Sequence, residues 1–205
     1  MERLIINAAL TGIVPQRKDN SNVPLSQQEI VDDAERCVAA GASILHLHIR
    51  NEDGSSASSR ERNAALFAAV RARCLGVLIS GSTSGRVEGA VERRAEVLDA
   101  GPDLASLTLG SMNFPTQASV NAPATIRELA RRMRARGILP ELELFDLGMA
   151  DYALSPPRGA AATYLEPVVT ATYAALADHY EQSLASAVIQ APTRHGGARS
   201  GRELP

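Results

Sequence analysis

The chain has 205 residues, a net charge of −2 and 45% hydrophobic side chains, which is typical of one globular domain with a sizeable core. The near-neutral charge, the absence of tryptophan and the 3% aromatic content argue against nucleic acid or an anionic membrane as a partner. The lack of a long apolar run or secretory pattern, together with two widely spaced cysteines, predicts a cytoplasmic protein.

Short apolar strands alternate with amphipathic helices along the first three-quarters of the chain. The expected strands are residues 4–10, 43–49, 77–83, 104–110 and 140–146, and the expected helices are residues 24–41, about 59–73, 86–101 and 122–137. Ser26 and Glu29 have the spacing of a capping box, and Gly41 can end the helix that they begin. This alternation indicates parallel strands joined by right-handed crossovers.

Polar residues cluster directly after the strands, where α/β enzymes keep their chemistry. The clusters are Thr11-Gly12, His46/His48/Arg50, residues 80–85, residues 108–111 and Glu143/Asp146. Five strands that contribute polar groups at one end favour a (β/α)8 TIM-barrel type over an open, doubly wound sheet. Residues 1–154 are then the N-terminal part of a barrel that stops after about five βα units.

The pattern changes at Ser155. Residues 155–205 contain no further strand–helix unit, and we expect one helix within 163–190 followed by a disordered tail. An unclosed barrel leaves an open sheet edge, so we expect a homo-oligomer if the chain folds.

The stretch "SILHLHIR" places His46 and His48 two residues apart on one strand, so both side chains point to one face. Two neutral imidazoles that share a volume form a good zinc half-site. The alternative is that both are buried histidines bonded to nearby carbonyls. A catalytic zinc usually has three protein ligands, so this interpretation requires one more.

Two other segments carry candidate chemistry. "SGSTSG" (80–85) offers backbone amides and the hydroxyls of Ser82 and Thr83 as a nest for a carboxylate or phosphate, or it is only a flexible turn. "ELELFD" places Glu141 and Glu143 on one face and Asp146 on the other, and the alternation does not choose between the two glutamates. The arginines of 131–136 form a solvated helix face, with Met133 pointing inward.

Five ordered motifs resemble the beta-keto acid cleavage enzymes over residues 1 to about 154. The motifs are "NAALTG" (7–12), "AGASILHLHIR" (40–50), "ISGSTSG" (79–85), "LGSMNF" (109–114) and "PELELFDLGM" (140–149). The resemblance implies a zinc-dependent (β/α)8 acyltransferase that condenses a beta-keto acid with acetyl-CoA. The products would be acetoacetate and a new acyl-CoA, as in lysine catabolism.

The resemblance also assigns roles to individual residues. It implies His46 and His48 as zinc ligands, Ser82 and Gly85 as holders of the substrate carboxylate with Ser106 beside them, and Glu143 as a catalytic residue in the active site. In this pattern the zinc polarises the keto oxygen of the substrate.

Two departures from the family pattern affect these expectations. Val14 stands where several members carry a glutamate for a substrate amino group, so we expect a substrate without that group. The family's third zinc ligand, a glutamate in "G-x-E-D", and the arginine of "G-I-G-R" are both missing, which leaves Glu143, His179 or water as substitutes. The abrupt change after "FDLGMADYAL" suggests a shifted reading frame or a shortened gene model, and hence low activity and poor solubility.

Two other functions remain open at this level. A zinc hydrolase of the amidohydrolase type also uses His-x-His on a barrel strand, although usually on the first strand, and no metal-bridging lysine is evident at a strand end here. An inactive fragment or assembly partner could instead pair through its open sheet edge. Metal content separates both enzymes from the fragment, and dependence on acetyl-CoA separates the two enzymes.

Overall fold

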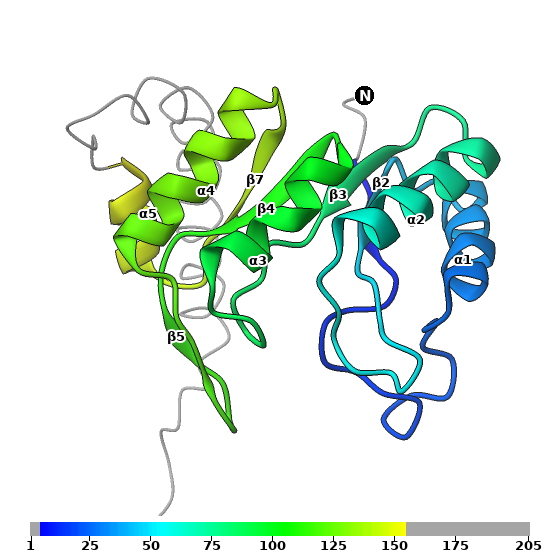
Figure 1. The fold of residues 1–205 in the computed structure, drawn as a ribbon, viewed down its shortest axis with the longest axis horizontal. Helices are drawn as coiled ribbons and strands as arrows, with labels where there is room; N and C mark the ends of the chain where they lie inside the picture. The colour runs from blue at the N-terminus through cyan, green and yellow to red at the C-terminus, as the bar shows by residue number, and fades with distance from the viewer. Residues whose placement is uncertain (1–4, 155–205) are drawn as a thin grey trace, which may run out of the picture.

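The computed structural model describes residues 5–154, which form a parallel sheet with helices along it (Figure 1). The elements in chain order are β1 (Asn7–Ala9), α1 (Gln27–Ala39), β2 (Ile44–Leu47), α2 (Arg60–Arg73), β3 (Leu78–Gly81), α3 (Val91–Ala95), the 3-10 helix η1 (Glu96–Ala100), β4 (Leu104–Thr108), β5 (Met112–Asn113), β6 (Ala118–Ser119), α4 (Pro123–Ala135), β7 (Leu139–Glu143) and α5 (Leu147–Leu154). The helix and tail predicted for 155–205 lie outside the described residues.

The order of strands in the sheet is the order in the chain. The sheet runs β1-β2-β3-β4-β7, and every neighbouring pair is parallel. A doubly wound sheet reverses its strand order at a switch point, whereas a barrel does not. Figure 1 shows β2 and β3, followed by β4 and β7, from right to left. The predicted α/β fold of the TIM-barrel type is therefore confirmed, with five βα units in the described part of the chain.

The sheet is strongly curved, because its two outermost strands contact each other through side chains. The Asn7 amide on β1 donates a 2.6 Å hydrogen bond to Glu141 Oε1 on β7. In a flat sheet, four steps of about 4.8 Å would put these strands about 19 Å apart. Asn7, Ser80 and Glu141 come from the first, third and fifth strands, and alternate strands supply one layer of a barrel interior.

The hydrophobic core lies between the sheet and the helices. Leu45 and Leu47 of β2 pack in it with Ile79 and Leu107 of the next strands, and Phe67 of α2 is fully buried there. Met133 of α4 is also fully buried, as the sequence predicts, and Cys74 is buried as a free thiol. The strand residues between these apolar positions point to the opposite, concave face.

Local signals in the sequence explain most element boundaries. Glu29 N donates to Ser26 Oγ at 3.3 Å, and Ser26 N donates to Glu29 Oε2 at 3.0 Å, which is the predicted capping box at the start of α1. The backbone φ angle of Gly41, just after α1, is 108°, a value that favours glycine. Pro123 starts α4, where its missing N–H costs nothing.

Three features differ from the expectation or were missed. The helix expected over 86–101 begins only at Val91 and tightens into η1, because residues 86–90 belong to the loop that follows β3. The two-residue strands β5 and β6 are too short to leave a periodic signal. Asp146 accepts a 2.8 Å hydrogen bond from Met149 N at the start of α5, so it caps a helix that the pattern did not predict.

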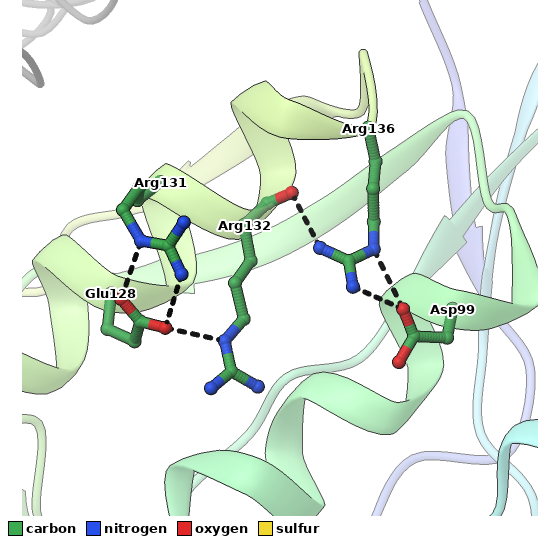
Figure 2. Close-up of polar contacts among 5 residues, drawn as sticks. All are labelled: Asp99, Glu128, Arg131, Arg132 and Arg136. Atoms are coloured by element: carbon green, nitrogen blue, oxygen red, sulfur yellow. Dashed lines mark hydrogen bonds and ion pairs between the residues drawn. The ribbon is translucent and has the colours of Figure 1, made fainter.

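The arginines of α4 make ion pairs on the outside of the molecule (Figure 2). Arg131 and Arg132 donate to Glu128 one helical turn away at 2.7–2.8 Å, and these bonds lower the pKa of Glu128 to about 2. Arg136 Nε donates to Asp99 of η1 at 2.8 Å and ties the two helices together. The predicted solvated arginine face is thereby confirmed. Within residues 5–154, no helix is both long and apolar enough to cross a membrane.

Candidate active site

His46 and His48 lie side by side at the C-terminal end of β2. Their ring centroids are 4.8 Å apart with an interplanar angle of 63°. Leu45 and Leu47 are buried on the other face, at 0% and 1% exposure. The two imidazoles therefore share the concave face, as the alternation of the strand predicts.

A chain of hydrogen bonds connects His46 to three other strands. His46 Nδ1 lies 3.1 Å from Ser80 Oγ on β3, and Ser80 Oγ donates to Glu141 Oε2 on β7 at 2.5 Å. Asn7 of β1 donates to the other oxygen of the same carboxylate. The nearby His46, whose Nδ1 is 3.6 Å from Glu141 Oε2, lowers the pKa of Glu141 most; burial opposes this, and the hydrogen bonds from Ser80 and Asn7 assist it.

His48 is held as a neutral imidazole. Burial lowers the pKa of His48 to about 3, and the neighbouring His46 and Arg50 lower it further. Its Nδ1 atom is buried and has no hydrogen-bond partner within residues 5–154. An imidazole that is neutral and has an unpartnered buried nitrogen is chemically suited to bind a metal ion.

The described residues supply two side chains that fit zinc as ligands, His46 and His48. Within the described residues, no group of three or more histidine, cysteine, aspartate or glutamate side chains could hold a metal ion. Glu143 does not join the histidines, because its Oε2 accepts a 2.5 Å hydrogen bond from Thr108 on the neighbouring strand. His179, the other candidate ligand, lies outside the described residues.

The loop after β3 is built around a buried arginine that the sequence reading missed. Arg94 of α3 is 4% exposed, and it donates to Thr83 O at 2.8 Å and to Asn121 Oδ1 at 2.7 Å. Burial lowers the pKa of Arg94, and the nearby Glu143 raises it. A Cβ on Gly85 would lie 2.6 Å from Arg94 Nη1, so glycine is required there for the guanidinium to fit.

The predicted anion nest is only partly available. Thr83 is 2% exposed, its amide donates to Ser106 Oγ at 3.0 Å, and its hydroxyl donates to Ser106 O at 2.5 Å. Thr83 therefore joins the loop to β4 and is not free to bind a ligand, which corrects the expectation for its hydroxyl. Ser82 Oγ accepts from Ser84 N at 3.4 Å, and its own proton stays available.

A cavity of about 160 Å³ opens beside these groups, between the ends of β2 and β3 and the start of α2. Its polar lining includes His48, Asn63, Ser82, Ser84 and Arg94. Among the residues with predicted roles, His48 and Ser82 thus meet at one cavity. His46, Gly85, Ser106 and Glu143 are not among the residues that line it.

Arg50, one of the predicted strand-end residues, has a structural position. Its guanidinium donates to Gly12 O at 2.6 and 3.1 Å, to Gly54 O at 2.9 Å and to Pro15 O at 3.1 Å. It therefore fixes the loop after β1 against the loop after β2. Thr11, at the start of the first of these loops, has a buried hydroxyl that lacks a partner within residues 5–154.

Comparison with known protein families shows which family this chain belongs to. The family model described as beta-keto acid cleavage enzyme matches residues 3–173. The chain belongs to the beta-keto acid cleavage enzyme family. The resemblance predicted from the five motifs is thereby confirmed.

Individual members of the beta-keto acid cleavage enzyme family are also similar to this chain. The 3-oxoadipate:acetyl-CoA acetyltransferase of Cupriavidus necator is 40% identical over 151 residues, which cover 74% of this chain and 53% of the relative. The 3-keto-5-aminohexanoate cleavage enzyme of Fusobacterium nucleatum is 39% identical over 155 residues, which cover 75% and 57%. The chain therefore spans about half the length of these curated relatives.

Solved structures support the same fold. The apo structure of ObcA superposes with a TM-score of 0.60 at 23% identity, and the match covers 70% of this chain and 34% of that chain. The ternary complex of ObcA with C4-CoA adduct and oxalate superposes with a TM-score of 0.61 over 70% of this chain and 35% of that chain.

Proposed function

We propose that this chain carries the metal-binding and carboxylate-binding part of a site that cleaves a beta-keto acid with acetyl-CoA, giving acetoacetate and a new acyl-CoA. Family membership and the relatives named as acetyl-CoA-dependent enzymes support this reaction. The observation that carries the proposal is the pair of imidazoles 4.8 Å apart at the end of β2, beside a cavity lined by Ser82 and Arg94.

His46 and His48 would hold a zinc ion. Bound zinc would polarise the keto oxygen of the substrate. The chain supplies both ligands as side chains of one rigid strand end, which keeps their spacing constant. His48 is neutral for the reasons given above, so it needs to lose no proton before it binds a metal.

Ser82, Gly85 and Ser106 would bind the substrate carboxylate, as the family pattern implies. Arg94 supports this role, because its guanidinium lies directly under the loop and makes no ion pair with any carboxylate of residues 5–154. A buried positive charge beside the 160 Å³ cavity raises the local affinity for an anion. The Ser82 proton can be donated to the same group.

Glu143 would act as the catalytic base. Its carboxylate projects from the end of β7 and is oriented by the hydroxyl of Thr108. A base in this position could accept a proton from the carbon between the keto group and the carboxylate, which is the most acidic carbon of such a substrate. Val14 supports a substrate without an amino group, since it offers no charge for one.

The first experiment measures zinc per chain and activity on the purified full chain. We expect near-stoichiometric zinc that is lost in the His46→Ala, His48→Ala double variant, together with weak acetyl-CoA-dependent cleavage of 3-oxoadipate. Soluble wild-type protein without zinc would refute the metal site. Zinc without dependence on acetyl-CoA would favour a hydrolase of the amidohydrolase type.

The sheet edges favour a second candidate, an assembly partner. Among the described residues, β1 and β7 each pair with a strand on one side only. We propose a homo-oligomer that covers these edges, in the cytoplasm, where thiols such as Cys74 stay reduced. Analytical ultracentrifugation of the metal-free chain tests it, since a monomer would exclude this role.

A further inference from the structure

The hydrogen-bond chain on the concave face has a direction that can be worked out from its atoms. Glu141 accepts from Asn7 Nδ2 at 2.6 Å and from Ser80 Oγ at 2.5 Å. A glutamate carries no proton at neutral pH and can only accept. Both of its contacts are therefore donors, and the hydroxyl proton of Ser80 points to Glu141.

This direction determines which ring nitrogen of His46 carries the proton. A serine hydroxyl has one proton and two lone pairs. Because the proton of Ser80 is already directed to Glu141, Ser80 Oγ can only accept at its 3.1 Å contact with His46 Nδ1. His46 Nδ1 must therefore carry a proton, so in the neutral imidazole it is His46 Nε2 that keeps the lone pair.

We propose that Glu141 is a positioning residue that acts through Ser80 to hold His46 in its Nδ1–H form, so that Nε2 is presented to a divalent metal ion. The metal half of this inference rests on the proposed function, whereas the tautomer is a property of the metal-free chain. Carboxylates that orient a ligating histidine in this way typically change metal affinity by about 10–100-fold when removed.

Glu141 and Glu143 are two residues apart on β7, but only Glu141 can have this role. Ser80 Oγ contacts both Glu141 Oε2, at 2.5 Å, and His46 Nδ1, at 3.1 Å, and Glu141 Oε2 is itself 3.6 Å from His46 Nδ1. Glu143 accepts from Thr108 of β4 instead. Both are glutamates on one face of one strand, so Glu143→Gln removes the same charge and serves as a matched control.

Glu141→Gln should reverse the chain of hydrogen bonds. Asn7 donates to one side of the carboxylate, so the new amide would place its oxygen toward Asn7 and its NH2 group toward Ser80. Ser80 would then accept from Gln and donate to His46 Nδ1, which stabilises the Nε2–H form. The volume of the side chain hardly changes, so the fold should be retained.

The decisive experiment is 1H–15N NMR of the histidine rings in the zinc-free full chain. We expect Nδ1–H for His46 in wild type and in Glu143→Gln, and a shift toward Nε2–H in Glu141→Gln. Nε2–H in wild type, or an unchanged Nδ1–H in Glu141→Gln, would overturn the proposal.

A competition titration with a chromogenic zinc chelator tests whether Glu141 strengthens metal binding by His46. We expect Glu141→Gln to weaken zinc binding about 10–100-fold relative to wild type, with a much smaller loss in Glu143→Gln. Equal losses in both variants would overturn a specific role for Glu141. If the NMR result is as expected but wild type binds no zinc, the proposed function fails and the tautomer assignment stands.

Discussion

Glu128 on α4 and Glu141 on β7 are both held by hydrogen bonds to two neighbouring residues, yet they represent opposite kinds of polar network. Glu128 binds Arg131 and Arg132, three and four residues away on the same helix, on the outer surface (Figure 2). Glu141 binds Asn7 and Ser80, which come from two other strands of the curved sheet. The helix by itself creates the first network, whereas the second exists only when the sheet curls.

The two networks also differ in energy. Exposed ion pairs within a helix contribute little to stability, because water and salt screen them and the side chains lose entropy. Polar groups inside a barrel have already lost their water, so breaking their hydrogen bonds leaves unsatisfied atoms. We therefore expect the interior polar groups to matter for stability far more than the greater number of surface ion pairs.

Two adjacent arginines of α3 give the largest expected contrast. Arg94→Met leaves the buried acceptors Thr83 O and Asn121 Oδ1 without their donor and should lower the free energy of unfolding by about 3 kcal/mol. Arg93→Met removes an exposed pair with Glu96 and should cost less than about 1 kcal/mol. Urea denaturation measures both, and equal losses would contradict the contrast.

The two glutamates of the opening comparison should give a smaller difference. Glu141→Gln disturbs a partly buried hydrogen-bond chain and should lower the free energy of unfolding by about 1–2 kcal/mol. Glu128→Gln should leave the urea midpoint unchanged within error, since its partners are on the surface. If Glu128→Gln were the more destabilising variant, the comparison would be wrong.

The capping box of α1 predicts an effect of pH on stability that is smaller than the effects of the two preceding comparisons. Hydrogen bonds from the Ser26 backbone, then from Arg17 and Leu25, lower the pKa of Glu29 from 4.5 to about 2. A lowered pKa adds stability above about pH 4.5 that is lost as the pH falls toward 2. Because Glu29 is 41% exposed, we expect less than about 1 kcal/mol.

Denaturation curves between pH 2.5 and 6, a range chosen around the two pKa values of about 2 and about 4.5, check this effect. Glu29→Gln should flatten the loss of stability on acidification relative to wild type. An identical acid slope in both proteins would mean that the capping carboxylate does not contribute.

The smallest expected effect is that of salt on the surface network. Raising the salt concentration to about 1 M shortens the Debye length to about 3 Å and should remove any residual difference between Glu128→Gln and wild type. The deficit of Glu141→Gln should persist in the same titration, because its partner Ser80 is fully buried. A deficit of Glu141→Gln that vanished in salt would place this network at the surface.

Several features of the fold follow from short-range patterns. The capping box at Ser26 and Glu29 and the inward Met133 depend on residues within a few positions of each other, so the sequence predicts them. The hairpin of β5 and β6 and the helix α5 were missed, because two-residue strands and a single capping Asp146 give too little periodic signal.

The site was predicted less completely. Alternation along β2 correctly places His46 and His48 on one face, and alternation along β7 does the same for Glu141 and Glu143 without ranking them. The contact of Ser80 with both His46 and Glu141 depends on strand register, which single strands do not encode. In the sequence, nothing distinguishes Arg94 from the other charged residues of its helix. Arg94 is buried only because α3 packs under the loop after β3.

The sequence by itself determined the order of the five sheet strands and the helices between them, the capping box of α1, the shared face of the two histidines and the family. These depend on local periodicity or on motifs read along the chain. Only the tertiary structure decided that Asn7, Ser80 and Glu141 are in contact. It also decided that the glutamate near His46 is Glu141 and not Glu143. The physical reason is that curvature and register bring together side chains as far apart in the chain as Asn7 and Glu141, and no local pattern records that approach.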